Sequence, residues 1–176
     1  AAECYFLRAE GAMRGWNMKM DAQTAYETGI TTSFAQYGLA GQDVAYMNDE
    51  TKVPATYVDP LNSSNSEAIN STITIKWDEE ASEEEKLERI ITQKWIAIWP
   101  LGTEAWAEQR RTGYPAFLSV KVNNSGDGSL STELASRVPF PPSEALNNTV
   151  FYNDAVQKLG GADNYATKLW WDKKNN

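Results

Sequence analysis

The sequence predicts a mainly α-helical protein in which long irregular loops connect the helices. Apolar residues recur at spacings of three and four over residues 2–16, 21–37 and 83–99, the spacing that forms one face of a helix. Capping residues, glycines and prolines mark the ends of these segments. Polar stretches without such periodicity follow at 48–80 and 121–136. These patterns favour a helical scaffold that carries long loops.

Composition narrows the functional classes. The 176 residues are enough for one domain with a sizeable core, and they carry 16 basic against 24 acidic side chains, a net charge of −8. Because no basic run is present, nucleic acid is not an expected partner. No stretch approaches the roughly 18 uninterrupted apolar residues of a membrane span. Histidine is absent, which rules out a histidine-based triad within the chain, and we expect neither a metal nor a cofactor.

Cys4 is the only cysteine, so no disulfide framework can form within the chain. A lipid-anchored cysteine would follow an apolar run that ends in small residues, whereas Ala1-Ala2-Glu3 precedes Cys4. We therefore expect Cys4 to be a small buried hydrophobe on the first helix.

The segments 2–16 and 21–37 are predicted to form a helical hairpin. Asp21 is placed to cap the second helix, and Gly38 is placed to end it. The apolar face of the first helix comprises Ala2, Phe6, Ala9, Met13 and Trp16.

The hairpin, residues 2–37, resembles a single tetratricopeptide-type unit. A lone unit cannot bury its own apolar face, and about three are normally needed. Since the sequence contains no second copy, we expect residues 1–176 to be the C-terminal part of a larger protein. By itself the chain should then associate through an exposed apolar patch. Small residues stand where the two helices must approach closely, at Ala9, Ala12, Ala25 and Gly29.

The longest predicted helix, 83–99, begins with a capping box formed by Ser82 and Glu85. The segment before it alternates apolar and polar residues, which predicts a short strand or an extended segment. The alternating apolar residues are Ile73, Ile75 and Trp77.

One face of helix 83–99 is strongly apolar. From Trp95 to Trp99 the helix is apolar nearly all round, so we expect its C-terminal half to be fully buried. Deleting the Trp95 ring should then destabilise the fold more than deleting the ring of Trp77. The predicted buried stripe is Leu87, Ile90, Ile91, Trp95, Ile98 and Trp99, and the residues predicted to face water are Lys86, Arg89 and Gln93.

A second short helix is predicted after Pro100, which cannot continue the first. Thr103 is placed to cap this helix, and Trp106 is a further candidate for the core. Gly113 can take the left-handed conformation at its end, and Pro115 blocks continuation.

Arg110 and Arg111 stand in the last turn of that helix, where the helix dipole favours cations. They could clamp a carboxylate or a phosphate. We favour structural roles, in which they cap helix carbonyls and form ion pairs with Glu104, Glu108 or an acidic residue elsewhere.

The C-terminal segment, 103–176, contains a final predicted helix over 148–159. Phe151, Ala155 and Leu159 are predicted to face inward. The run 169–172 carries too much apolar area to remain in water, so it should dock on the body of the protein.

Several motifs together resemble the C-terminal region of SusD/RagB-family nutrient-binding lipoproteins of the bacterial outer membrane, and they occur in the order of that family. The resemblance covers essentially the whole chain. At one place the chain departs from it, because Ser136 precedes Arg137 and Phe140 stands where the family usually has a tyrosine. The matching stretches are Glu3 to Glu10 with Arg14-Gly15-Trp16, Tyr26 to Ser33, Leu87 to Trp95, Arg110 to Pro115, Pro141 to Glu144, Leu159-Gly160-Gly161 and Trp170-Trp171-Asp172.

The resemblance implies a non-catalytic protein on the cell surface, held at the outer membrane by a lipid anchor outside this chain. Its partner would be a SusC-like TonB-dependent transporter, to which it delivers oligosaccharides or other nutrients. The tetratricopeptide-like helices would supply the scaffold and the contact with the transporter.

A ligand site, if this portion contains one, is predicted at Tyr57, Trp77 and Asp78, beside the Asn-rich loop 62–70. Only this segment combines aromatic rings, expected to be exposed, with polar neighbours that could bind sugar hydroxyls. The alternative is that the loop folds over the scaffold and Trp77 fills a gap there.

Two other functional classes stay open. A helical protein-interaction module without a ligand would explain the absence of catalytic motifs equally well. A glycoside hydrolase domain would need two carboxylates across a cleft. The acidic run at 79–85 is more simply solvated charge at a helix start.

A calcium loop at 123–128 is disfavoured, since its twelfth position is Leu134 rather than glutamate.

Overall fold

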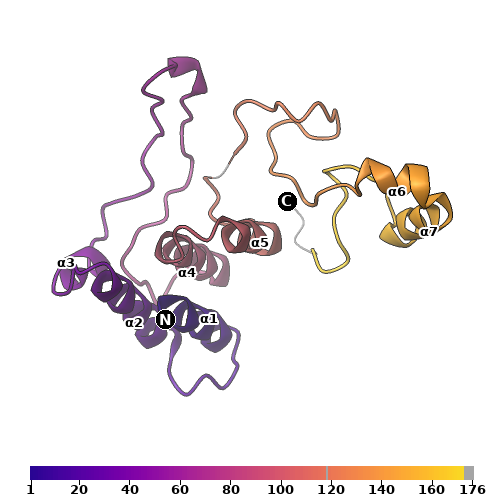
Figure 1. The fold of residues 1–176 in the computed structure, drawn as a ribbon. Coiled ribbons are helices and arrows are strands. Elements are labelled where there is room, and N and C mark those ends of the chain that lie inside the picture. The colour runs from indigo at the N-terminus through magenta and orange to yellow at the C-terminus, as the bar shows by residue number, and fades with distance from the viewer. Residues whose placement is uncertain (118, 173–176) are drawn as a thin grey trace. The chain divides into compact units, whose positions relative to one another are not determined.

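A computed structural model describes residues 1–117 and 119–172 (Figure 1). The described residues form seven α-helices and one 3-10 helix, and no β-strand is found among them. The predicted mainly α-helical class is therefore confirmed. The helices are α1 (Ala2–Met13), α2 (Ala22–Gln36), α3 (Asp43–Met47), η1 (Ser63–Asn65), α4 (Glu83–Ala97), α5 (Gly102–Thr112), α6 (Pro142–Asn147) and α7 (Thr149–Leu159).

The chain divides into two compact units. The first unit comprises Ala1–Tyr57 and Ala68–Phe117, and it contains α1 to α5. The second comprises Val58–Glu67 and Leu118–Asn176, with η1, α6 and α7. None of the described helices is long and apolar enough to cross a membrane.

The first unit is built on the predicted hairpin of α1 and α2, which lie side by side in Figure 1 and pack on α4. The two helices approach closely because Gly29 has no side chain. A Cβ placed there would lie 2.8 Å from the ring of Phe6. Ala9 and Ala25 are fully buried at the same contact. Asp21 caps α2 by accepting a hydrogen bond from the Thr24 amide at 2.7 Å, as predicted.

The first helix is shorter than predicted. It ends at Met13, and Gly15 then turns the chain with a φ of +78°. Trp16 therefore lies beyond the helix and is exposed, rather than on its buried face. Cys4 is also exposed, so the prediction of a buried cysteine was wrong. At 3.6 residues per turn, position 4 points away from the face that carries Phe6.

The capping box of α4 is present, with the Ser82 amide donating to Glu85 and the Glu85 amide donating back to the Ser82 hydroxyl. Leu87, Ile90 and Ile91 are buried, as predicted.

Two predictions about the faces of α4 were wrong. Both Arg89 and Gln93 are buried. Residues 73–77, which bend at 75 and 76, cover Arg89, and its Nε donates to the Thr74 carbonyl. The Gln93 side chain accepts a hydrogen bond from the Tyr46 hydroxyl of α3. The C-terminal half is not fully enclosed in this chain, since Ile96 is exposed and Trp99 is 73% exposed. Trp95 and Trp106 are half-buried.

The α5 helix begins at Gly102, two residues earlier than a Thr103 cap would allow, and no side chain caps it. Gly113 ends it in the left-handed conformation, as predicted, with a φ of +75°. Arg111 forms the expected ion pair with Glu108 at 2.7 Å. It also binds both carboxylate oxygens of Glu10 on α1, at 2.7 and 2.6 Å.

Lys94 is a second, buried cation at the contact between α1, α4 and α5. Lys94 is 1% exposed, and its ammonium lies 3.0 Å from Glu108, 3.3 Å from Glu3 and 3.5 Å from Glu104. Arg110 places its guanidinium 3.9 Å from the ring centre of Trp106. Both arginines thus take scaffold roles among the described contacts.

The second unit is organised around a buried ion pair between Arg137 and Asp163. The Asp163 carboxylate also accepts the Phe140 amide and the Tyr152 hydroxyl, each at 3.1 Å. Phe151 is exposed, so its predicted inward orientation was wrong, and the neighbouring Tyr152 takes the inner position.

The run 169–172 docks only in part. Asp172 is buried and Trp171 is half-buried, whereas Trp170 is 83% exposed.

Candidate functional site

Trp77, the central residue of the predicted ligand site, is not an exposed platform. Its side chain is 7% exposed, and its ring centre lies 5.3 Å from that of Tyr26. The indole N–H donates to Glu79 at 2.7 Å, and the Lys86 ammonium lies 5.8 Å from the ring centre. The expectation of an exposed Trp77 ring was therefore wrong, because the indole packs within the first unit.

Trp77 is buried because buried and exposed side chains alternate along the segment before α4. Ile73, Ile75 and Trp77 all point into the first unit, while Lys76 and Asp78 are exposed. Tyr57 is also exposed. A ligand role for Tyr57, Trp77 and Asp78 stays a prediction.

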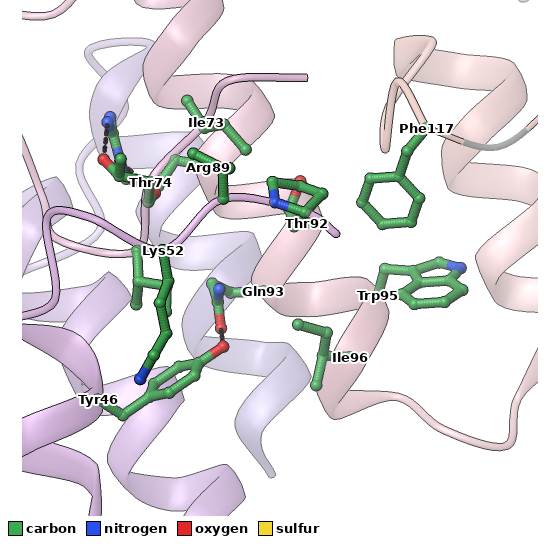
Figure 2. A pocket seen from close by; sticks show the side chains of 13 residues that line it. Tyr46, Lys52, Ile73, Thr74, Arg89, Thr92, Gln93, Trp95, Ile96 and Phe117 are labelled. Carbon is green, nitrogen blue, oxygen red and sulfur yellow. Dashed lines mark hydrogen bonds between the residues drawn. The ribbon is translucent and has the colours of Figure 1, made fainter. Parts of the chain in front are cut away.

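A pocket of about 260 Å³ lies along α4 in the first unit (Figure 2). Residues 52–54 and 73–75 and the side chain of Phe117 bound it, together with residues of α3 and α4. Its volume is just below the range of about 300–1,000 Å³ that is common for small-molecule sites. It can therefore hold one sugar ring or one substituent rather than an extended oligosaccharide.

One wall of the pocket is aromatic and aliphatic. Trp95 and Phe117 meet edge to face, with ring centres 5.5 Å apart and planes at 85° (Figure 2). Ile73, Ile96 and Pro54 extend this apolar surface. Such a wall suits the apolar face of a sugar or a methyl group.

The opposite side of the pocket is polar, and part of it is already paired. The Tyr46 hydroxyl donates to the Gln93 side-chain oxygen at 3.0 Å, a bond drawn in Figure 2. Burial raises the pKa of Tyr46, so the hydroxyl stays protonated at neutral pH. Lys52 forms an ion pair with Asp49 at 3.0 Å.

Arg89 and Thr92 supply the remaining polar atoms of the wall. Arg89 donates through Nε to the Thr74 carbonyl at 3.1 Å, and its Nη2 lies 3.4 Å from the Thr74 hydroxyl. The Arg89 Nη1 and the Thr92 hydroxyl are buried and have no hydrogen-bond partner. Unpaired buried polar groups are uncommon and costly, which draws attention to this corner of the pocket.

Sequence reasoning missed this pocket because helical periodicity assigned Arg89 and Gln93 to the solvent side of the helix. The useful signal was the alternation at 73–77. A segment with one apolar side packs against the rest of the unit, and here it covers Arg89 on α4.

The first unit also contains a more open groove, with a volume of about 490 Å³. Trp16 and Trp77 line it together with Glu79, Glu83 and Lys86. Two of its charged groups are engaged already, since Lys86 lies 3.3 Å from Glu79. No group of His, Cys, Asp and Glu suited to a metal ion occurs within residues 1–117 and 119–172.

The first unit is thus a helical scaffold with a small, largely apolar pocket. The family model described as SusD-like, the Susd and RagB outer membrane lipoproteins, matches residues 1–172, and the chain belongs to this family. Comparison with curated proteins yields no match.

Solved SusD homologues are similar in both sequence and fold. A chitin-binding SusD homologue from Flavobacterium johnsoniae is 49% identical with a TM-score of 0.89, and a SusD homologue from Bacteroides uniformis is 51% identical with a TM-score of 0.89. A SusD-like protein from Bacteroides thetaiotaomicron is 42% identical with a TM-score of 0.90. Each comparison covers 99% of this chain but 36% of the other, so the chain spans just over a third of the length of these relatives.

Proposed function

We propose that this chain is part of a nutrient-binding lipoprotein at the surface of the outer membrane, and that the nutrient is an oligosaccharide. Family membership supports the lipoprotein class. The observation that carries the choice of ligand is the 49% identity to a chitin-binding homologue over nearly the whole chain. The pocket at Trp95 and Phe117 supplies an apolar wall of the kind that sugars use.

The proposed partner is a SusC-like TonB-dependent transporter. Exposed apolar side chains in the first unit support a role in protein contact, because such patches often mark interaction surfaces. Tyr37 donates its hydroxyl to the Trp99 carbonyl at 2.9 Å, and both residues are exposed next to Ile96. This patch is where we place the contact with a partner.

A binding role fits the acidic residues at the start of α4 better than a hydrolytic role. A glycosidase acid needs a raised pKa. Here, hydrogen bonds from Trp77 and then Lys86 lower the pKa of Glu79, and those from Ser82 lower the pKa of Glu85. Glu84 accepts the Tyr114 hydroxyl at 2.9 Å. These carboxylates organise the helix start, and we assign them no catalytic role.

Calorimetric titration with a panel of oligosaccharides tests the proposal. Chitin fragments are the first ligands to use, with malto- and xylo-oligosaccharides for comparison. We expect saturable binding of at least one member and no release of new reducing ends over the same period. Hydrolysis that is lost on substitution of Glu79 or Glu85 would contradict a purely binding role.

A further inference from the structure

The open groove at Trp16 combines an exposed aromatic ring with several carboxylates. Its volume of about 490 Å³ lies within the range of about 300–1,000 Å³ that is common for small-molecule sites. Trp16 is 63% exposed, and Trp77 lines the groove as well. The turn between α1 and α2, the segment before α4 and the first turns of α4 all contribute side chains, so the groove lies entirely within the first unit.

The Trp16 ring is held in place although most of its surface is exposed. Gly11 on α1 has no side chain, and a Cβ there would lie 3.3 Å from the Trp16 ring and 2.9 Å from the Met18 sulfur. The Trp16 amide donates to the Gly11 carbonyl at 2.9 Å. Arg8 secures the same turn by donating to the Met18 carbonyl at 2.7 Å. A ring that is ordered before binding loses little conformational entropy when a ligand covers it.

The polar side of the groove is rich in hydrogen-bond acceptors. Asp21, Glu79 and Glu83 line it, and an ionised carboxylate has about four acceptor positions. Asp21 uses two of these positions for the amide and the hydroxyl of Thr24, at 2.7 and 2.8 Å. Glu83, at the first position of α4, is exposed to solvent. The groove therefore suits a ligand with several donors, whereas a ligand with negative charge would be repelled.

We propose that the Trp16 groove is a second sugar-binding site, in which the apolar face of a sugar ring stacks on Trp16 and its hydroxyls donate to Asp21 and Glu83. This inference rests on the proposed function for the class of ligand. It adds a site outside the pocket along α4 and a selectivity against acidic sugars. A β-linked glucose ring has equatorial hydroxyls, so both of its faces carry only C–H groups and either face can lie on an indole.

Two disaccharides that differ in one group test this selectivity. Cellobiose and cellobiouronic acid share the β-1,4 linkage, and a carboxylate in the second replaces one hydroxymethyl group of the first. The chain has seven tryptophans, so a ¹H–¹⁵N spectrum of the full chain gives one indole N–H signal for each, assigned with single Trp→Phe variants. Cellobiose should shift the Trp16 signal saturably, and cellobiouronic acid should bind at least about tenfold more weakly. The signal of Trp170, which is 83% exposed, is the internal control and should stay unchanged.

Two substitutions locate the site, with the Trp77 signal as the second reporter from the groove. Trp16→Ala removes the stacking surface and should weaken cellobiose binding about tenfold. Trp170→Ala is the matched control, since it removes an even more exposed ring, and it should leave the affinity unchanged. Glu83→Gln keeps the shape and an acceptor oxygen but removes one negative charge. It should reduce the preference for cellobiose over cellobiouronic acid about threefold and change the cellobiose affinity less than twofold.

The outcomes separate this inference from the proposed function. If cellobiose shifts the Trp95 signal and leaves the Trp16 signal unmoved, the groove site is overturned and the proposed function stands. Equal shifts of the Trp16 and Trp170 signals would indicate non-specific contact and overturn the site as well. Equal affinities for the two disaccharides overturn the role of the carboxylates. If no oligosaccharide of the calorimetric panel shifts any indole signal, both the groove site and the proposed function of this chain are contradicted.

Discussion

Replacing Trp77 by alanine should destabilise the first unit strongly, although the residue stands in a segment that looks like a polar loop. The side chain is 7% exposed, and its ring lies 5.3 Å from that of Tyr26 and below the Lys86 ammonium. Deleting a buried tryptophan typically costs about 3–5 kcal/mol of unfolding free energy, because a cavity remains. The loss of the aromatic pair with Tyr26 is included in that range.

Trp95 provides the comparison, because it is half-buried beside a pocket. Trp95→Ala should cost roughly 1–2 kcal/mol, and Trp170→Ala, at an exposed position, should stay within about 0.5 kcal/mol of the parent. The sequence alone predicts the opposite ranking of Trp77 and Trp95. Urea unfolding followed by circular dichroism gives all three free energies.

A milder variant keeps the comparison informative if Trp77→Ala does not fold. Trp77→Phe keeps most of the ring but removes the donor to Glu79, so it should cost about 1–2 kcal/mol. The reasoning would be refuted if Trp95→Ala cost as much as Trp77→Ala, or if Trp77→Ala left stability unchanged.

Three further predictions follow from the packing of the first unit. Lys94→Met should cost about 1–3 kcal/mol in urea unfolding, because the buried Glu108 carboxylate loses one of its two cations and keeps only Arg111; an unchanged midpoint would contradict this. Gly29→Ala should cost about 1–3 kcal/mol by overpacking, whereas Gly102→Ala, which meets no neighbour, should not lower the melting temperature. Burial raises the pKa of Glu10, but Arg111 and then Arg14 outweigh it and lower the pKa below the ordinary 4.5. The stability that this carboxylate contributes is therefore complete above pH 4.5 and is lost as pH falls further. Arg111→Met should make the unfolding free energy fall less steeply with decreasing pH in this range.

The local structure was largely predictable from the sequence. The Ser82–Glu85 box, the Asp21 cap and the left-handed Gly113 depend on residues within one turn of each other, so local patterns determine them. The family resemblance rested on motifs rather than on helical spacing, and it was confirmed.

Burial was harder to predict, because it depends on what covers each face. Helical spacing placed Arg89 towards water, but a segment fifteen residues earlier covers it. The apolar C-terminal end of α4 suggested full burial, yet Trp99 remains exposed in this chain. Glu10 and Arg111 pair across 101 residues, a partnership that no local pattern contains.

A crystal structure of the protein with N,N′-diacetylchitobiose is the most direct test of the central claim, that this chain binds a nutrient sugar in the pocket along α4. We predict electron density for a sugar ring packed against Trp95 and Phe117. Density for the sugar at another surface, with the pocket empty at saturating ligand, would contradict the claim.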